Sequence, residues 1–193
     1  APTGNGSIGP RRRRRRLRSK WMDPRMYFLP TDFVGGENKD SREQNVLAKW
    51  LTLEVGKPLA EGVGEAGGAA DIFEWNAEET KRIYGQTVES RFPNTRVHVY
   101  YQPVGVVAAL VPWNFPLILA SRKISTALAA GCSVICKPDV ITPGTVMELV
   151  DICRESGVPE GVVNLLSGDP ASVSEQLIEL SLIHISEPTR HTR

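Results

Sequence analysis

A carboxamide side chain stands between two prolines in the run Pro112-Trp113-Asn114-Phe115-Pro116. The prolines restrict the backbone around Asn114. An asparagine held in a fixed place can donate an N–H to an oxygen that gains negative charge during a reaction. The run therefore indicates oxyanion stabilisation by Asn114. On these residues alone, the alternative that Asn114 only caps the following helix stays open.

Three short apolar runs, rich in β-branched residues, lead into polar residues: 104–111, 133–136 and 162–166. The first is nearly continuous in apolar residues, as expected for a strand that is buried on both faces. Neighbouring parallel strands end at one edge of their sheet, where α/β proteins bind their ligands. We therefore expect three segments to share a ligand-binding edge: 111–114, 136–139 and 166–169.

Helical patterns connect these runs. Pro116 suits the first turn of a helix whose apolar residues recur at helical spacing until Gly131. Thr142 and Pro143 supply an N-cap and a first-turn proline for a second helix, which ends at Gly157. The order strand, helix, strand, helix, strand predicts an α/β fold with two right-handed βαβ units in a parallel sheet.

Upstream of the sheet, the pattern from Asn45 to Arg82 is helical, and Lys57-Pro58 breaks it into two helices. Val97 to Tyr101 is strand-like. The string Gly62-Val63-Gly64-Glu65-Ala66-Gly67 has the spacing of a dinucleotide-binding turn. It lies inside the second helix rather than between a strand and a helix, so we interpret it as part of the helix.

The cysteines do not indicate a reactive or metal-binding site. Cys132 and Cys136 lie in or beside an apolar run, where cysteine usually acts as a small buried hydrophobic residue. No Cys/His grouping has the spacing of a zinc site, so we expect no metal. Only one further cysteine, Cys153, is present, which is too few for a disulfide framework and fits a reducing compartment.

Charge is spread unevenly over the 193 residues. The net charge is +1, yet residues 1–20 hold eight of the 23 Lys and Arg residues and no acidic residue. Six consecutive arginines could form a nucleic-acid-binding arm, but we favour a solvated or artefactual segment, because no aromatic residues alternate with them. No apolar run approaches the roughly 20 residues that span a membrane. With no signal peptide at the start, we expect a soluble, cytoplasmic protein.

The end of the chain is also unlike its middle. Ser181 to Arg190 is similar to a translated sequencing adapter, which would exclude His184 and His191 from any evolved site. A natural C-terminal strand and tail is the alternative.

Motifs in the middle of the chain occur in a fixed order and spacing: Gln102 to Pro116, Arg122-Lys123, Ala127 to Cys132, Lys137-Pro138, Thr142-Pro143, Gly157 to Asn164 and Ser167 to Asp169. Together with Thr52 to Leu59, Phe73 to Trp75 and Arg82 to Gly85, they strongly resemble the NAD(P)-dependent aldehyde dehydrogenase superfamily. The resemblance implies N-terminal helices plus the first half of a Rossmann-like parallel-sheet cofactor domain. It divides the chain into a non-matching segment 1–44, a partial dehydrogenase domain 45–179 and a tail 180–193.

The resemblance also implies a reaction and its residues. A small aldehyde, with succinate semialdehyde the favoured choice, would be oxidised to a carboxylate with NAD or NADP. Asn114 corresponds to the asparagine that stabilises the oxyanion formed by thiolate attack. Val111, Pro112 and Trp113 would line the cofactor, with Trp113 beside the nicotinamide ribose. Lys137 would donate hydrogen bonds to the adenosine ribose hydroxyls.

Val140 departs from the family pattern. Many NAD-preferring members carry at this position a glutamate that binds the ribose diol. A valine does not repel a 2′-phosphate, so NADP is admissible beside NAD.

Other family motifs are missing from the sequence. They are the Gly-Ser-Thr turn, the Glu-Leu-Gly-Gly motif with its general base and the Gly-Gln-x-Cys nucleophile. The resemblance therefore implies an inactive fragment of a homo-oligomeric enzyme, with its pairing strand region near Val97 to Gln102. Two alternatives stay open: a truncated nucleotide-binding or interaction module without catalysis, and a nucleic-acid-associating protein that acts through its arginine tract.

Overall fold

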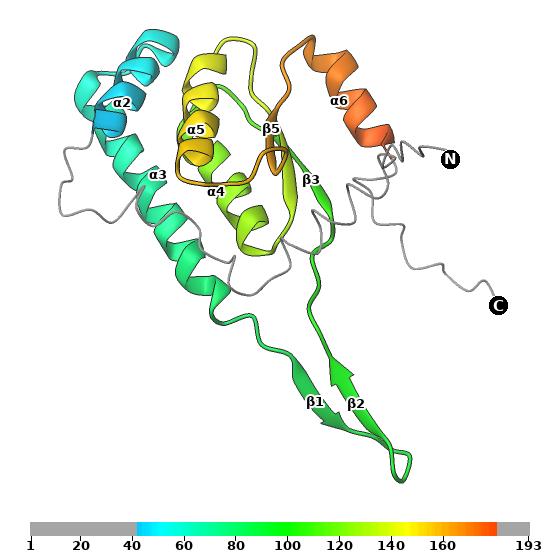
Figure 1. Cartoon of the computed structure of the whole chain (residues 1–193). Coiled ribbons are helices and arrows are strands. Elements are labelled where there is room, and N and C mark those ends of the chain that lie inside the picture. The colour runs from blue at the N-terminus through cyan, green and yellow to red at the C-terminus, as the bar shows by residue number, and fades with distance from the viewer. Residues whose placement is uncertain (1–41, 181–193) are drawn as a thin grey trace, which may run out of the picture.

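Two helices begin the part of the chain that the computed structural model describes, residues 42–180. Helix α2 (Arg42–Val55) and helix α3 (Leu59–Thr80) form the hairpin at the left of Figure 1. Pro58 occupies the N-cap position of α3, so the predicted break at Lys57-Pro58 is confirmed. The arginine tract and the adapter-like tail lie outside the described residues.

Glycine lets α3 approach α2 closely. A Cβ on Gly62 would lie 2.8 Å from the carbonyl oxygen of Ala48 and 3.2 Å from its Cα. A Cβ on Gly64 would meet nothing within 4 Å. The string from Gly62 to Gly67 lies inside α3, which confirms that it is not a dinucleotide-binding turn. Its first glycine serves helix packing instead.

Three parallel strands form the sheet, in the order β3 (Val106–Leu110), β4 (Ser133–Lys137) and β5 (Val163–Leu165). Helix α4 (Pro116–Ala129) connects β3 to β4, and helix α5 (Pro143–Glu155) connects β4 to β5. The two predicted βαβ units are confirmed. Gly131, with a φ of 73°, follows α4 in the left-handed region that favours glycine.

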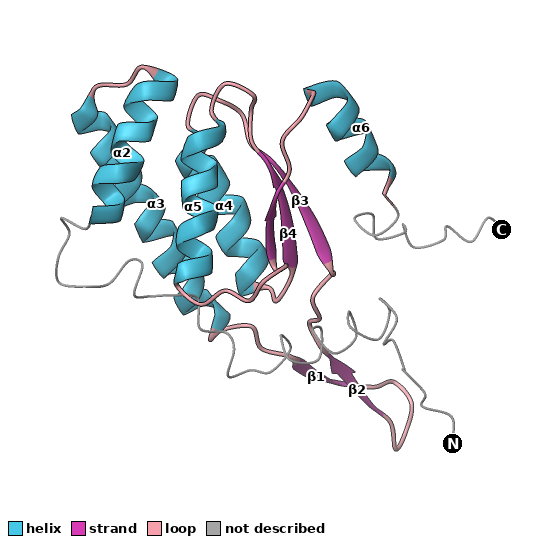
Figure 2. Cartoon of the chain, turned by 45° about the horizontal axis from the view of Figure 1, so that its top comes forward, coloured by secondary structure: helices cyan, strands magenta, loops and turns pink. Residues whose placement is uncertain are grey.

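Helices lie on both sides of this sheet. Helices α4 and α5 cover one side, and α3 packs against α4. Helix α6 (Pro170–Glu179) lies on the other side (Figures 1 and 2). The sequence reasoning did not predict α6, although Asp169 followed by Pro170 is a helix start signal.

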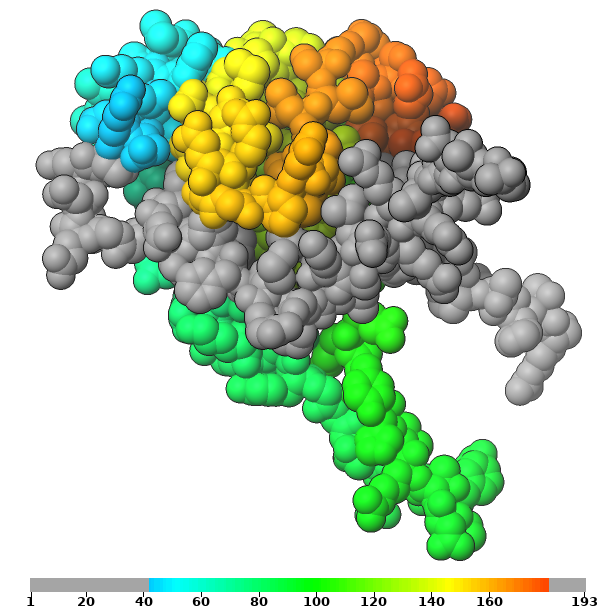
Figure 3. Space-filling model, in the orientation of Figure 1, coloured from blue at the N-terminus to red at the C-terminus, as the bar shows by residue number. Residues whose placement is uncertain are grey.

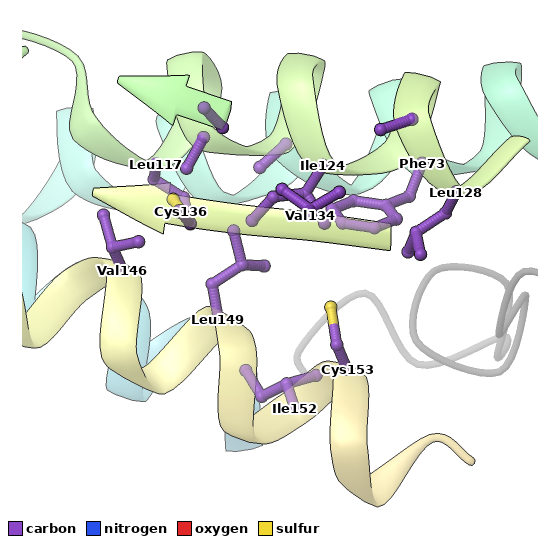
Figure 4. Close-up of a cluster of buried hydrophobic side chains, with 14 of the residues drawn as sticks. Phe73, Leu117, Ile124, Leu128, Val134, Cys136, Val146, Leu149, Ile152 and Cys153 are labelled. Carbon is purple, nitrogen blue, oxygen red and sulfur yellow. The ribbon is translucent and has the colours of Figure 1, made fainter. Parts of the chain in front are cut away.

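The hydrophobic core lies between the sheet and the helices α3, α4 and α5. Figure 4 shows side chains from these elements that meet in the core and are each at most 5% exposed: Phe73, Leu117, Ile124, Leu128, Val134, Cys136, Val146, Leu149, Ile152 and Cys153. Each large aliphatic or aromatic side chain buried here stabilises the fold by about 1.5–3 kcal/mol. Asn76 of α3 adds a polar link to α4, because its amide donates to the Ser125 hydroxyl at 2.9 Å.

The prediction that the first sheet strand is buried on both faces is wrong for the described residues. Ala109 of β3 pairs with Cys136 of β4, and both are 0% exposed in the core. Leu110 is 39% exposed. Side chains alternate along a strand, so Leu110 belongs to the opposite face, which the described elements cover only in part.

A two-stranded hairpin projects from the body of the molecule (Figures 1 and 3). Strand β1 (Gln86–Glu89) pairs antiparallel with β2 (Arg96–Val99), and every residue of both strands is exposed. The strand predicted at Val97 to Tyr101 is therefore confirmed in part, displaced toward the N-terminus. Its partner β1 was not predicted.

Replacing Gly62 by alanine is expected to destabilise the fold by about 1–3 kcal/mol, because the new methyl group would press on backbone atoms of Ala48. Gly64→Ala is the matched control. It places the same methyl group in open space and should stabilise the fold by up to about 1 kcal/mol, since alanine favours helix. Urea unfolding followed by circular dichroism measures both changes. Equal effects at the two positions would contradict the close packing of α2 and α3.

The buried thiols are expected to be unreactive. Burial raises the pKa of Cys136 to about 12 and that of Cys153 to about 12. At pH 8 a thiol with such a pKa is ionised in about one molecule in 10,000, and the thiolate is the reactive form. An aromatic disulfide reagent should therefore label the native chain very slowly and label all three cysteines at once in guanidinium. Rapid labelling of the native chain at Cys136 or Cys153 is the contrary result.

Candidate functional site

The strand ends meet at one edge of the sheet, as predicted. Leu110 pairs with Lys137, and the N–H of Val111 donates to the carbonyl oxygen of Lys137 at 3.0 Å. On the other side of β4, the N–H of Leu166 donates to the carbonyl oxygen of Cys136 at 2.9 Å. The turns that follow β3, β4 and β5 therefore leave the sheet side by side.

The sequence-predicted site residues fall in two of these adjacent turns. The turn between β3 and α4 holds four of them: Val111, Pro112, Trp113 and Asn114. Lys137 is the last residue of β4, and Val140 lies in the turn that follows it. Val111 and Lys137 are buried, whereas Trp113 and Val140 are each 52% exposed.

Asn114 does not cap the helix that follows it. Helix α4 begins at Pro116, and Phe115 occupies its N-cap position without a side-chain capping bond. Asn114 is exposed, and its carboxamide makes no hydrogen bond to any other residue of the described range. The capping alternative therefore does not explain this asparagine, and its N–H donors are available to a ligand.

A glutamate from α3 caps α4 instead. Oε1 of Glu65 accepts hydrogen bonds from the N–H groups of Leu117 and Ile118, both at 3.2 Å. Glu65 is 5% exposed and lies 52 residues before Leu117 in the chain. A carboxylate is favoured at this place, because the first N–H groups of a helix have no partner within the helix and carry partial positive charge.

Lys57 pairs with the same glutamate. Its ammonium forms an ion pair with Oε2 of Glu65, and the two side chains are 11% and 3% exposed. The Lys57 Nζ also lies 3.6 Å from the centre of the Phe115 ring. Removing one partner of such a buried pair costs roughly 3–5 kcal/mol, because the other charge stays buried without compensation.

A second glutamate caps α5. Glu54 of α2 accepts the N–H of Gly144 at 2.6 Å, the N–H of Thr145 at 2.8 Å and the Thr145 hydroxyl at 2.6 Å. Trp50 lies over Gly144, where a Cβ would come within 2.6 Å of its ring. The α2/α3 hairpin therefore supplies the N-terminal acceptor of both helices that cover this side of the sheet.

The predicted capping role of Thr142 is wrong. Thr142 occupies the N-cap position of α5 and Pro143 follows at the first helical position, as expected. Its hydroxyl, however, makes no capping bond and is buried without a hydrogen-bond partner among the described residues. The reason is that Glu54 already occupies the N–H groups that a threonine cap would bind.

Lys137 is 6% exposed, and its Nζ donates to the carbonyl oxygen of Pro138 at 3.2 Å. No carboxylate within residues 42–180 forms an ion pair with it. An ammonium carries three N–H donors, so two remain for a ligand. Hydroxyl groups or a phosphate would supply the missing acceptors, and the donor set therefore fits the ribose of a dinucleotide.

Helix α6 is capped within its own segment. The carboxylate of Asp169 accepts the N–H of Ser172 at 2.9 Å. All three helices that follow the sheet strands thus have a carboxylate at their N-terminus. A phosphate at these places would have to displace a carboxylate, so the donors open to a ligand are side chains in the turns rather than helix N-termini.

The sequence reasoning missed the two capping glutamates and Lys57. Their partners lie far along the chain, 90 residues away for Glu54, and no local pattern connects them. One signal was present for Glu65. It shares a helical stripe of small and apolar residues with Ala69 and Phe73, where a charged residue needs a partner.

No helix in the range 42–180 is long and apolar enough to cross a membrane. In the same range, no three side chains of the types His, Cys, Asp or Glu gather in an arrangement that could hold a metal ion.

Comparison with proteins of known sequence gives close relatives. The chain is 51% identical over 132 residues to 4-(hydroxymethyl)benzenesulfonate dehydrogenase TsaD1 of Comamonas testosteroni, which covers 68% of this chain and 28% of the relative. It is 45% identical over 140 residues to the NADP(+) succinate-semialdehyde dehydrogenase GabD of Escherichia coli, with 72% and 29% covered. The chain thus spans less than a third of the length of these relatives.

Solved structures agree with this result. An NADP-dependent enzyme of Escherichia coli superposes with a TM-score of 0.80 and 38% identity over 87% of this chain and 35% of that structure. A betaine aldehyde dehydrogenase mutant of Staphylococcus aureus, in complex with NAD+, gives a TM-score of 0.75 and 32% identity over 83% of this chain and 33% of that structure.

The family model for aldehyde dehydrogenases matches residues 40–186, which include every strand and helix described above. With this match, the parallel sheet and the relatives at 45–51% identity, the chain belongs to the aldehyde dehydrogenase family.

Proposed function

We propose that this chain is the N-terminal part of an NAD(P)-dependent dehydrogenase that oxidises a small aldehyde to a carboxylate. One observation carries the proposal. At the carboxyl edge of the sheet, Asn114 has a carboxamide that no described residue engages, and the neighbouring turn holds the buried ammonium of Lys137 with donors to spare. Free donors of these two kinds, in adjacent turns, suit an oxyanion and a ribose.

Asn114 would act on the aldehyde oxygen. A nucleophile that adds to the carbonyl carbon places negative charge on the aldehyde oxygen. An N–H donor already positioned beside that oxygen lowers the energy of the charged state. The nucleophilic cysteine and the glutamate base of the family would come from sequence beyond Glu179. The buried thiols of this chain do not suit the nucleophile's role, because burial raises the pKa of Cys136 and Cys153 to about 12.

NAD(P)+, when bound, accepts the hydride that leaves the substrate carbon. Lys137 would hold the ribose on the adenosine side, and Trp113 with Val111 and Pro112 would border the other half of the cofactor. Val140 is exposed on the turn of Lys137 and offers no carboxylate to a ribose diol. Either NAD or NADP is therefore compatible with this turn.

The favoured substrate is succinate semialdehyde or an aldehyde of similar size. Its support is the activity of two relatives, the succinate-semialdehyde dehydrogenase GabD of Escherichia coli and the succinate semialdehyde dehydrogenase of Acinetobacter baylyi, the second of which is 46% identical over 133 residues.

The complete protein is proposed to form a homo-oligomer through the β1–β2 hairpin. Apolar and aromatic side chains of the hairpin and the segment after it are exposed: Val88, Val97, Val99, Tyr100 and Tyr101. Such side chains on a projecting hairpin suit contact with a second copy of the chain.

The division of the chain into segments is also a proposal. We propose that residues 45–179 are the dehydrogenase part, that 1–44 and 180–193 are separate from it, and that the chain alone is inactive. A cytoplasmic location remains a prediction from the sequence.

Continuing the coding sequence of the natural gene past Glu179 and assaying the purified product tests the function. We expect Glu-Leu-Gly-Gly and Gly-Gln-x-Cys motifs downstream, and reduction of NAD+ or NADP+ that depends on added succinate semialdehyde. The present 193-residue chain, assayed alongside, should be inactive. A stop codon directly after the present end, or a complete protein that reduces neither cofactor with any of a panel of aldehydes, would refute the proposal.

In the complete enzyme, Asn114→Ala is expected to lower the rate constant of hydride transfer by about 100- to 1,000-fold, because the oxyanion loses a hydrogen-bond donor. Asn164→Ala is the control. Among the described residues, the amide of Asn164 on β5 bonds only to the backbone carbonyls of Val134 and Gly161, so its loss weakens the fold without touching the site. Single-turnover hydride transfer, followed at the absorbance of the reduced cofactor, measures both. A single-turnover rate constant for Asn114→Ala within threefold of the wild-type value excludes the oxyanion role.

A further inference from the structure

The turn that carries Asn114 has little to hold it in place by itself. Residues 112–115 are all exposed, and the Asn114 side chain has no partner in the described range. Yet an oxyanion donor works only when it is fixed to within a fraction of an ångström of the developing charge. The position of Asn114 must therefore be set by groups outside the turn.

Glu65 fixes the backbone on the C-terminal side of the turn. Its Oε1 binds the N–H groups of Leu117 and Ile118, three and four residues after Asn114. Pro116 precedes them at the first position of α4 and restricts the backbone between anchor and asparagine. Rotation or sliding of the helix start would break both hydrogen bonds at once.

Lys57 connects the same anchor to the turn itself. It forms the ion pair with Oε2 of Glu65 and lies over the ring of Phe115, the residue directly after Asn114. Both carboxylate oxygens of Glu65 therefore have partners. Oε1 accepts the first N–H groups of α4, and Oε2 pairs with the Lys57 ammonium that contacts the turn. The anchor is itself held rigidly, because α3 packs along α4 and Asn76 hydrogen-bonds to Ser125.

We propose that Glu65 is a positioning residue, which acts through the start of α4 and through Lys57 to hold Asn114 in register for oxyanion stabilisation. Glu54 holds the turn between β4 and α5 in the same way, because it accepts the N–H groups of Gly144 and Thr145 directly after that turn. The α2/α3 hairpin thus positions the turn of Asn114 through Glu65 and the turn after Lys137 through Glu54. This inference rests on the function proposed above.

Matched isosteric variants of the complete enzyme test this proposal. Glu65→Gln keeps the shape of the side chain but removes its charge and turns an NH2 group toward a donor. We expect its single-turnover rate of acylation, at saturating cofactor and aldehyde, to fall tenfold or more, on the order expected for a misplaced catalytic group. Its Kd for the cofactor should change by less than about twofold.

Glu54→Gln should instead affect cofactor binding more than acylation. Its Kd for NAD(P)+ is expected to rise about fivefold or more, a larger factor than its effect on acylation. Glu61→Gln serves as the unchanged control, because Glu61 lies exposed in the first turn of α3 and its side chain forms no hydrogen bond or ion pair with another residue in the range 42–180. Hydrogen exchange on the same proteins should rise over residues 112–118 in Glu65→Gln and over 138–145 in Glu54→Gln.

A second variant keeps the test decisive if Glu65→Gln folds poorly. The double variant Lys57→Met with Glu65→Leu replaces the buried ion pair by apolar groups of similar volume, which commonly preserves stability. It still removes the acceptor of α4, so acylation should fall as in Glu65→Gln, while the melting temperature should lie above that of Glu65→Leu alone, which leaves the Lys57 ammonium buried without its partner.

Each outcome decides a separate point. If Glu65→Gln and Glu54→Gln change the same constant by the same factor, the glutamates act through general stability and the positioning role is overturned. If the double variant folds and acylates at the wild-type rate, the role of Glu65 is overturned as well. If the wild-type enzyme itself reduces no cofactor, the proposed function fails, and the anchoring is then judged by hydrogen exchange alone, where unchanged exchange over 112–118 in Glu65→Gln rejects it.

Discussion

The first N–H groups of an α-helix have no partner inside the helix, and the organisation of this molecule follows from how they are satisfied. For α4 and α5 the acceptors are Glu65 and Glu54, which come from a helical hairpin far upstream in the chain. These bonds do more than complete two helices. They attach the hairpin to the sheet domain through charge-assisted contacts whose geometry is strict, and they fix where each helix begins. Because each turn of the site ends where a helix begins, the two carboxylates also fix the turns.

This arrangement leaves the donors of the site free. In many α/β proteins a phosphate binds directly to a helix N-terminus. Here a carboxylate already holds that place on all three helices of the sheet domain, so the negative charge of a dinucleotide would meet repulsion there. The groups that remain are the ammonium of Lys137 and the carboxamide of Asn114. Asn114 lies in the turn after β3 and Lys137 at the end of β4, and both keep N–H donors that the described residues do not use.

The glycine string in α3 illustrates how one sequence pattern can serve different physical ends. At a dinucleotide-binding turn, glycine permits close approach of a phosphate. In α3, Gly62 permits close approach of a neighbouring helix, since a Cβ would meet the carbonyl oxygen of Ala48 at 2.8 Å. The same closeness brings Glu54 and Glu65 onto one compact hairpin. The spacing of glycines alone does not separate these uses, whereas the helical pattern around the string does.

The sequence by itself determined the elements and their order. Apolar periodicity, the prolines at positions 116 and 143 and the glycine after α4 act within one turn or strand, so the two βαβ units, the hairpin break at Lys57-Pro58 and the shared edge of the strand ends could be predicted. Only the tertiary structure decided which side chains cap α4 and α5. Thr142 stands at the N-cap position of α5, yet Glu54, 90 residues before Gly144, takes the N–H groups. Local pattern gives a residue its candidate partners, but competition among acceptors is settled only when distant segments pack together. For the same reason the exposed face of β3 at Leu110 could not be predicted, because burial depends on which elements cover a strand and not on the strand's own composition.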